Sequence, residues 1–305
     1  IATPEAGAAM LKALSDYDVD VAKAAAAGLA RAGDAAAPQI AAALASADPR
    51  VRLRGAEATA GLRQPTLAAK ALTDTDSSVR ATAATSLGSV LARAQAIRKA
   101  LATLSGSAKD THADAWAELQ RQGGTDELQS ASAGAAKQAV VALLTEKANA
   151  ETEEGKKKPF TDQIEKLNTP GAPLAPLPDP SIPTAYTPLL NALSDADGAT
   201  ATAASTALAR LGKTVVPALS QKLGSPNETV AYLASQALTI IGREAVDGLL
   251  PAATSGAPTA RWAAVTLGQI GDPRAESALQ ALTSSSDPDT AYAAQTALAR
   301  VKPTG

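Results

Sequence analysis

Residues 227–242 read NETVAYLASQALTIIG, and this stretch decides the fold of the chain. With Val230 taken as position 0, small residues follow at +4 and +5, Leu238 at +8 and Gly242 at +12. On a helix of 3.6 residues per turn, positions 0, +4 and +8 share one face, and a glycine at +12 ends the helix. The stretch therefore predicts one short amphipathic helix that buries a single side.

The same spacing recurs along the chain, and this self-similarity is its dominant signal. Successive starts lie 30, 28 and 32 residues apart, then 89, then 30, 29 and 31. A shorter apolar segment precedes each start, so the unit is a helix A, a turn and a helix B. Such units predict an all-α solenoid of stacked two-helix repeats of about 30 residues. The helix B starts are Val21, Val51, Val79, Thr111, Thr200, Val230, Thr259 and Thr290.

The composition suits close helix packing and excludes several kinds of chemistry. Of 305 residues, 46% are hydrophobic but only 2% aromatic, and alanine, the best helix former, is the commonest residue. The absence of cysteine excludes disulfides, thiolate nucleophiles and cysteine-based zinc sites. A net charge of -2 gives no global electrostatic reason to bind nucleic acid or an anionic membrane.

The sequence pattern of the repeat resembles that of a known family. It is similar to the short HEAT-like repeat of the phycobilisome-lyase type, with its pattern D-x-x-V-R-x-x-A-A-x-x-L. The best matches are DPRVR at 48–52 and SSVR at 77–80. The resemblance covers most of 8–149 and 186–302 and is specific for the fold rather than for the function. Tetratricopeptide repeats need aromatics that this chain lacks, and the T-P-L-H signature of ankyrin repeats is absent.

The repeats are interrupted between the two arrays. We expect an N-terminal HEAT-like array over 1–149, a charged and Pro-rich connector over 150–183, and a C-terminal array over 184–305. The connector holds a charged run, 151–158, then a short amphipathic piece, and prolines that favour extended polyproline II. A linker between half-solenoids and a docking segment for a partner are both open readings. The prolines are Pro170, Pro173, Pro176, Pro178, Pro180 and Pro183.

Candidate catalytic and metal-binding residues are scarce. His112 is the only histidine, and we expect it at the surface, because a metal site or a hydrolytic triad needs more ligands than this chain offers. Helical di-iron hydroxylases built on HEAT-like repeats carry paired His-Glu motifs, which one histidine cannot supply. The carboxylates lie at caps and turns, as Asp18, Asp48, Asp74 and Asp287 do. We therefore expect no catalytic residue, no metal, no cofactor and no enzyme.

Residues 48–109 are locally basic, with ten basic and four acidic residues for a net +6. One interpretation is a surface for nucleic acid or an acidic partner. The other is that Arg52 and Arg80, the repeat's own +1 arginines, pair with turn aspartates of neighbouring units. The second is favoured because aromatic stacking residues are absent there.

The C-terminal units offer a better candidate surface. Positions +2, +3, +6 and +10 of helix B point away from the core positions at 100° per residue. In the last three units they hold aromatic and apolar residues with Arg, types that are enriched at binding hot spots. The alternative is that Leu233 and Trp262 pack between neighbouring helices. The predicted partner-binding residues are Tyr232, Ile240, Arg261, Trp262, Val265, Tyr292 and Arg300.

These observations predict a non-enzymatic protein-interaction scaffold or assembly subunit that uses the concave solenoid surface. A lyase or chaperone acting on a cofactor-carrying partner, and nucleic-acid binding through 48–109, are the alternatives. The sequence contains no run of about 18 apolar residues, so no membrane span is predicted. No small-molecule substrate is evident. The chain begins at Ile1, which a removed signal peptide or an arbitrary chain end would both explain. We expect an exported or periplasmic location, in a bacterial envelope, rather than a cytoplasmic one.

Overall fold

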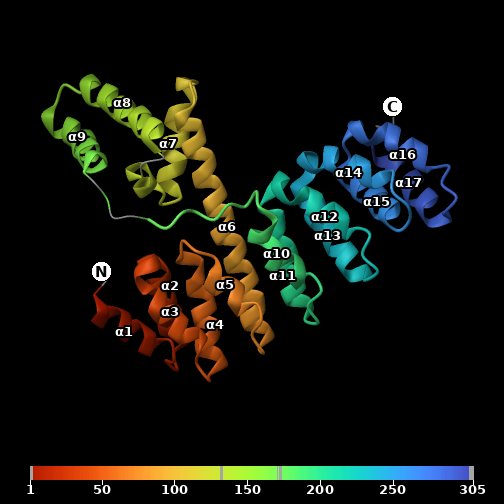
Figure 1. Cartoon of the computed structure of the whole chain (residues 1–305), viewed down its shortest axis with the longest axis horizontal. Coiled ribbons are helices and arrows are strands. Elements are labelled where there is room, and N and C mark those ends of the chain that lie inside the picture. Colours follow the sequence, from red (N-terminus) through yellow and green to blue (C-terminus); the bar gives the residue numbers. More distant parts are fainter. Residues whose placement is uncertain (1–2, 131–132, 170, 172–173, 302–305) are drawn as a thin grey trace. The chain divides into compact units, whose positions relative to one another are not determined.

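The computed structural model describes residues 3–130, 133–169, 171 and 174–301. Across these residues the chain is built from α-helices and short 3-10 turns, and no strand is found in them. The prediction of an all-helical solenoid is confirmed, and Figure 1 shows the helices stacked in successive pairs. None of the helices described is both long and apolar enough to cross a bilayer.

The chain forms two compact units, which differ from the predicted division at 149 and 183. Residues 1–92 and 179–305 make the first unit, and residues 93–178 make the second. The second unit is therefore an insertion between two parts of the first in the sequence.

The first unit contains the repeats. Its helices B begin at or about two residues before the predicted starts. The helices are α1 (Pro4–Ala13), α2 (Val19–Ala32), α3 (Ala37–Leu44), α4 (Pro49–Ala58), α5 (Thr66–Ala71), the first part of α6 (Ser77–Ser105), α10 (Pro183–Ala192), α11 (Gly198–Ala209), α12 (Val216–Lys222), α13 (Glu228–Ile241), α14 (Val246–Ala253), α15 (Thr259–Ile270), α16 (Glu276–Leu282) and α17 (Pro288–Val301).

The turn residues begin and end helices B as the sequence predicts. Asp18, Asp48 and Asn227 occupy the same place, three residues before position 0, and each accepts a backbone N–H of the first turn. At the other end, the +12 glycine takes a left-handed backbone angle, with φ of 72° at Gly242 and 68° at Gly271. A side chain is strained in that region, so glycine is the residue that ends these helices without cost.

Helix α6 departs from this pattern, and the prediction of two separate helices there is wrong. It runs without a break over 29 residues, Ser77–Ser105. Position +12 counted from Val79 is Leu91, so the glycine that ends α2, α13 and α15 is missing here. Helix B of this repeat continues through 97–104, where a separate helix A was expected.

The repeat that begins at Val79 packs directly on the repeat that begins at Thr200. Their buried side chains belong to one core, which includes Leu87, Leu91 and Leu208. The backbones approach so closely that a Cβ at Gly88 would lie 2.5 Å from the Cβ of Ala207. The solenoid stack is thus continuous across the insertion.

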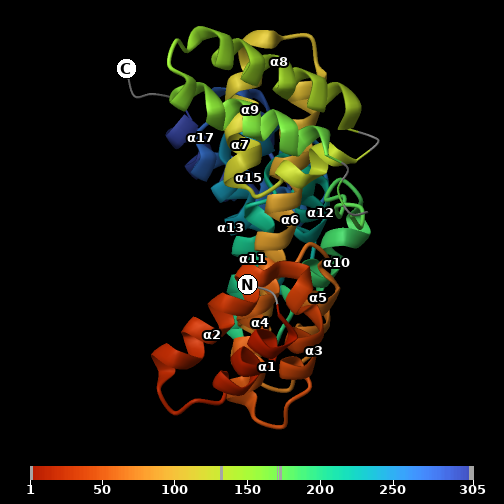
Figure 2. The same cartoon turned by 90° about the vertical axis from the view of Figure 1, so that its left-hand side faces the viewer.

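The second unit has its own core and its own helices, which lie together in Figure 2. Within the predicted connector, the amphipathic piece forms the helix α9 (Glu154–Asn168), which belongs to the second unit. The amphipathic residues Phe160, Ile164 and Leu167 explain this helix, because they pack on the core of the unit. The helices after the end of α6 are α7 (His112–Arg121), α8 (Gly134–Ala150) and α9 (Glu154–Asn168).

The segment 174–182 after α9 is not helical, as its prolines predict. Arg98 holds it down, because its Nε and Nη2 donate to the carbonyl oxygens of Pro178 and Leu177 at 3.1 and 3.0 Å. Pro170 and Pro173 lie outside the described residues. Residues 177 and 178 are therefore bound to α6 within the second unit.

Candidate functional site

The exposed face of the last helices B carries large apolar side chains. Tyr232 and Ile240 of α13 are 49% and 63% exposed, and Tyr292 of α17 is 72% exposed. These residues occupy positions +2 and +10, which the sequence places opposite the core. Since a monomeric solenoid has no need of such side chains in water, this face is a candidate binding surface.

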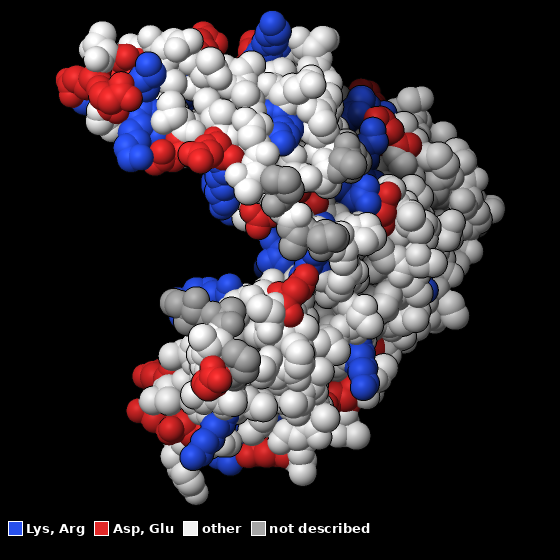
Figure 3. Space-filling view, turned by 60° about the vertical axis from the view of Figure 1, so that its left-hand side comes forward, with Lys and Arg blue, Asp and Glu red and all other residues white. Residues whose placement is uncertain are grey.

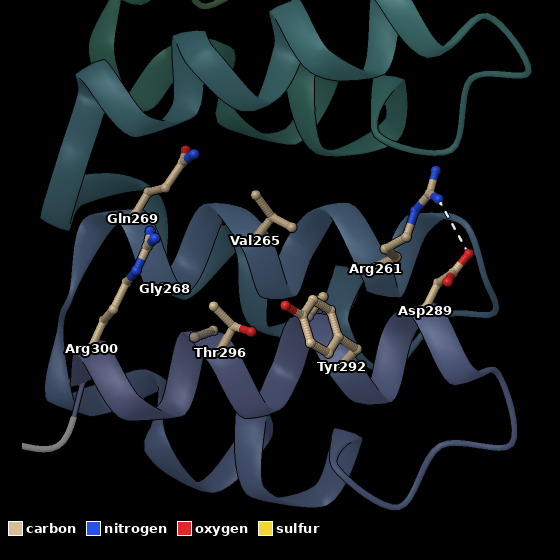
Figure 4. Close-up of a pocket in the computed structure, with 10 residues that line it drawn as sticks. Arg261, Val265, Gly268, Gln269, Asp289, Tyr292, Thr296 and Arg300 are labelled. Atoms are coloured by element: carbon tan, nitrogen blue, oxygen red, sulfur yellow. Dashed lines mark ion pairs between the residues drawn. The ribbon is translucent and has the colours of Figure 1, made fainter.

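A groove runs along this face between α15 and α17 (Figure 4). Its cavity has a volume of about 410 Å³. Positions +2, +6 and +10 of both helices contribute to its walls, so the helical period explains the lining. The groove is lined by Arg261, Val265, Gly268, Gln269, Asp289, Tyr292, Ala293, Thr296, Ala297 and Arg300.

Small residues form the base of the groove. A Cβ added to Gly268 would lie 2.5 Å from the Cβ of Ala297, so the two helices touch at this level. The same contact joins Gly88 and Ala207, because both glycines occupy +9 and both alanines +7. The groove is therefore a regular feature of repeat packing that the longer side chains of α15 and α17 surround.

The charges of the groove are unevenly distributed between its two ends. At one end, Arg261 pairs with Glu228 of α13 at 2.8 Å and with Asp289 of α17 at 3.7 Å. At the other end lies Arg300, which is exposed, and no carboxylate among the described residues pairs with it. Figure 4 shows Arg300 reaching from α17 toward α15, below Gln269.

A second contact ties the groove to the preceding helix. The rings of Tyr232 and Trp262 meet edge to face, with centroids 6.2 Å apart and planes at 65°. The guanidinium carbon of Arg261 lies 5.6 Å from the ring of Trp262, a cation–π distance. Trp262 is half-buried and packs against the core, so it supports this face more than it extends from it.

The structure separates the predicted binding residues into two sets. Arg261, Val265, Tyr292 and Arg300 line the groove, whereas Tyr232, Ile240 and Trp262 lie outside its lining. That these residues bind a partner stays a prediction.

Position +3 does not point outward as expected. Leu233 is only 7% exposed and belongs to the core of the first unit. The alternative reading, packing between helices, is therefore correct for Leu233. Sequence reasoning also missed Gly268 and Asp289 in the lining, although the glycine at +9 was a usable signal of close approach.

Two arginines of the basic stretch 48–109 form ion pairs between repeats. Arg52 Nε donates to Asp74 at 2.8 Å, and Arg80 Nε donates to Asp195 at 2.8 Å. The interpretation that these arginines pair with turn aspartates is confirmed. On the face shown in Figure 3, basic and acidic side chains are interspersed over each unit.

The prediction that His112 lies at the surface is wrong. His112 is only 8% exposed, and its Nε2 lies 3.1 Å from the carbonyl oxygen of Gly106. It begins α7 and packs into the second unit instead of lying at the surface. Across the described residues, no group of three or more His, Asp or Glu side chains is close enough to hold a metal ion.

Comparison with known proteins agrees with this architecture. The family model of HEAT repeats matches residues 186–266, which hold α11 to α14 and part of α15. No curated protein matches the sequence.

Solved structures with a similar fold include a human deoxyhypusine hydroxylase in complex with glycerol, 17% identical over 97% of this chain and 96% of that chain, with a TM-score of 0.31. They also include the complex of CpcE and CpcF of the phycocyanin lyase from Nostoc sp. PCC7120, 17% identical over 97% and 94%, with a TM-score of 0.31. An engineered protein is 20% identical over 98% and 89%, with a TM-score of 0.24. At these TM-scores no function is transferred from them.

Proposed function

We propose that this protein is an interaction scaffold that binds a protein partner on the helix B face of α13, α15 and α17. One observation carries the proposal. Tyr232, Ile240 and Tyr292 are exposed on one face and flank a groove lined by further helix B residues. Aromatic and Arg side chains supply much of the binding energy in protein interfaces when they become desolvated.

The rigidity of this face supports the same proposal. Helix α15 is anchored by the buried hydrogen bond between Ser235 and Thr266, with oxygens 2.8 Å apart, and by Thr239, which donates to Gln269 Oε1 at 2.8 Å. A surface held by regular helices loses little conformational entropy on binding, so its exposed residues contribute more of their contact energy to affinity.

The proposal is tested by site-specific photo-crosslinking in the cells that make the protein. A photoreactive phenylalanine analogue placed at Tyr292 or Ile240 should crosslink one defined protein, identified by mass spectrometry. The matched control is the same analogue at Gln280, which is exposed on α16, a helix A.

Crosslinks to the same protein from both helix B positions, and not from Gln280, are the expected result. Equal crosslinking patterns at all three positions would show that the helix B face is not a specific surface. The variant Tyr292→Ser should lose the crosslink made from Ile240 while keeping the thermal midpoint of the protein, because Tyr292 is mostly exposed.

A further inference from the structure

The groove between α15 and α17 has an arginine at each end. One of them forms ion pairs within the protein, and the other has no carboxylate partner among the described residues. Arg261 is shared between Glu228 and Asp289. Arg300 is exposed and has no acidic partner among the residues described. Between these ends lie Val265, Tyr292 and Ala293.

We propose that this groove binds a peptide segment of a partner protein in which one carboxylate lies two to four residues from an apolar side chain. This rests on the proposed function and deepens it by naming the chemistry of the partner. The carboxylate pairs with Arg300, and the apolar side chain covers Val265 and Tyr292.

The spacing follows from helix geometry. Tyr292 and Arg300 are eight residues apart on one helix, which is about 12 Å at 1.5 Å per residue. Thr296 lies halfway between them and adds a hydroxyl to the wall. An extended peptide advances about 3.3 Å per residue, so two to four residues separate a group at Arg300 from one above Val265 or Tyr292.

The charge pattern also fixes which end of the groove binds the carboxylate. At the Arg261 end, Glu228 and Asp289 already neutralise the guanidinium, and a further carboxylate there would meet two like charges. The carboxyl ends of α15 and α17 carry partial negative charge, which does not attract an anion. Recognition of the carboxylate therefore depends on Arg300, and the acidic residue binds only at that end.

The occupant is acidic and apolar rather than basic for the same reason. A basic side chain at the open end would face the Arg300 guanidinium without a carboxylate to pair with. A purely apolar segment would cover Arg300 and leave its charge unpaired on burial, which costs binding energy. A segment that carries both groups satisfies both parts of the groove.

The test uses the full chain and the fluorescein-labelled, amidated peptide Gly-Ser-Glu-Ser-Ser-Phe-Ser-Gly, measured by fluorescence anisotropy. Three control peptides replace Glu by Gln, Glu by Lys, or Phe by Ser. The first peptide should bind at least about tenfold more tightly than each control, because each control removes either the charge that pairs with Arg300 or the apolar ring that covers Val265 and Tyr292.

The matching protein variant is Arg300→Glu, which should weaken the Glu–Phe peptide at least about tenfold and should strengthen the Lys peptide. Arg243→Glu makes the same change of charge at a residue that is 82% exposed and lies outside the groove lining, so it is the control for net charge. Thermal denaturation of both variants establishes that they are folded, which their exposed positions lead us to expect.

Equal weakening by Arg300→Glu and Arg243→Glu would overturn the inference, because binding would then follow net charge alone. Equal binding of all four peptides would overturn it as well. Either result leaves the proposed function standing if crosslinks from Ile240 and Tyr292 still identify one partner. Loss of that crosslinking specificity is the separate sign that the proposed function itself fails.

Discussion

Arg80 and Asp195, which are 115 residues apart in sequence, form a paired hydrogen bond. Nε and Nη2 of Arg80 donate to the two carboxylate oxygens of Asp195, each at 2.8 Å. Arg52 and Asp74 form the same paired arrangement at 2.8 and 3.0 Å, only 22 residues apart. In both pairs the arginine is at +1 of one helix B and the aspartate lies five residues before the next. Asp195 thus does for Arg80 what Asp74 does for Arg52.

Removal of Arg80 should destabilise the first unit. Arg80→Met leaves Asp195 with its side chain only 13% exposed and without its paired donor, so we expect a loss of about 1–3 kcal/mol in the free energy of unfolding. Urea unfolding followed by circular dichroism measures this. Arg50→Met is the control, because Arg50 is 68% exposed in its pair with Asp48 and such pairs contribute about 0–1 kcal/mol. Equal losses in the two variants would contradict the special place of Arg80.

Stability should depend on pH through the same pair. The hydrogen bonds from Arg80 hold the pKa of Asp195 below its ordinary value. The folded state therefore binds fewer protons at this carboxyl than the unfolded state does, and the stabilisation is complete above an unfolded pKa of about 3.9. It is lost as the pH falls below that value and through the lower pKa of the folded protein.

The corresponding measurement compares wild type with Asp195→Asn in urea between neutral and acidic pH. At neutral pH the wild type should be the more stable protein. The difference between the two should shrink as the pH falls below about 4, where the wild-type carboxyl becomes protonated. A difference that stays constant over this range would show that the charge of Asp195 does not contribute.

The close contact between repeats predicts the effect of single methyl groups. Gly88→Ala places a Cβ 2.5 Å from that of Ala207, so the helices must shift, at a cost of about 1–3 kcal/mol. Gly198→Ala is the control, because nothing lies within 4 Å of its added Cβ and Ala in a helix stabilises by about 0.4–1 kcal/mol. The double variant Gly88→Ala with Ala207→Gly should recover part of the loss. Stabilisation by Gly88→Ala alone would contradict the packing.

Two substitutions in α13 can test which side of helix B packs against the core. Leu238 is fully buried, so Leu238→Ala should cost about 2–5 kcal/mol in the free energy of unfolding. Gln236, two residues earlier, is half-buried on the other side of the same helix, and Gln236→Ala should cost much less. Chemical denaturation of both variants checks this, and equal costs would show that the facing is wrong.

The first unit should fold without the second. Its core, the Arg80–Asp195 pair and the Gly88–Ala207 contact all lie within residues 1–92 and 179–305. A chain in which a short Gly-Ser linker replaces 93–178 should remain helical by circular dichroism and should unfold in one cooperative transition. A molten or aggregated product would show that the first unit depends on the insertion.

The repeat itself could be predicted from the sequence because its signals are local. The 3.6-residue period, the aspartates before Val21 and Val51, and the glycine after Leu238 each act within one helix or turn. For this reason the helix B starts and the core position of Leu238 could be foreseen, and the pairing of Arg52 followed from the repetition of the unit.

What the sequence did not reveal depends on tertiary partners. No local pattern distinguishes Asp195 from other turn aspartates as the acceptor of Arg80, so the continuous stack and the inserted unit were missed. The absence of glycine at position 91 did not by itself predict the long α6, because α4 also lacks a glycine at +12 and ends at Ala58. The exposed face of α15 and α17 was foreseen, but its groove also needs Gly268 and Ala297 to meet, and their distance appears only in three dimensions.

The arginine–aspartate pairing has a consequence for how such an array can grow. Closing a flexible loop costs an entropy that rises only with the logarithm of its length. Joining partners 115 rather than 22 residues apart therefore costs about 1.5 kcal/mol more at most, and less when the intervening chain is itself folded. The free energy of such an arginine–aspartate pair thus depends little on the number of residues between its two partners. A whole folded unit can be accommodated between neighbouring repeats at little thermodynamic cost.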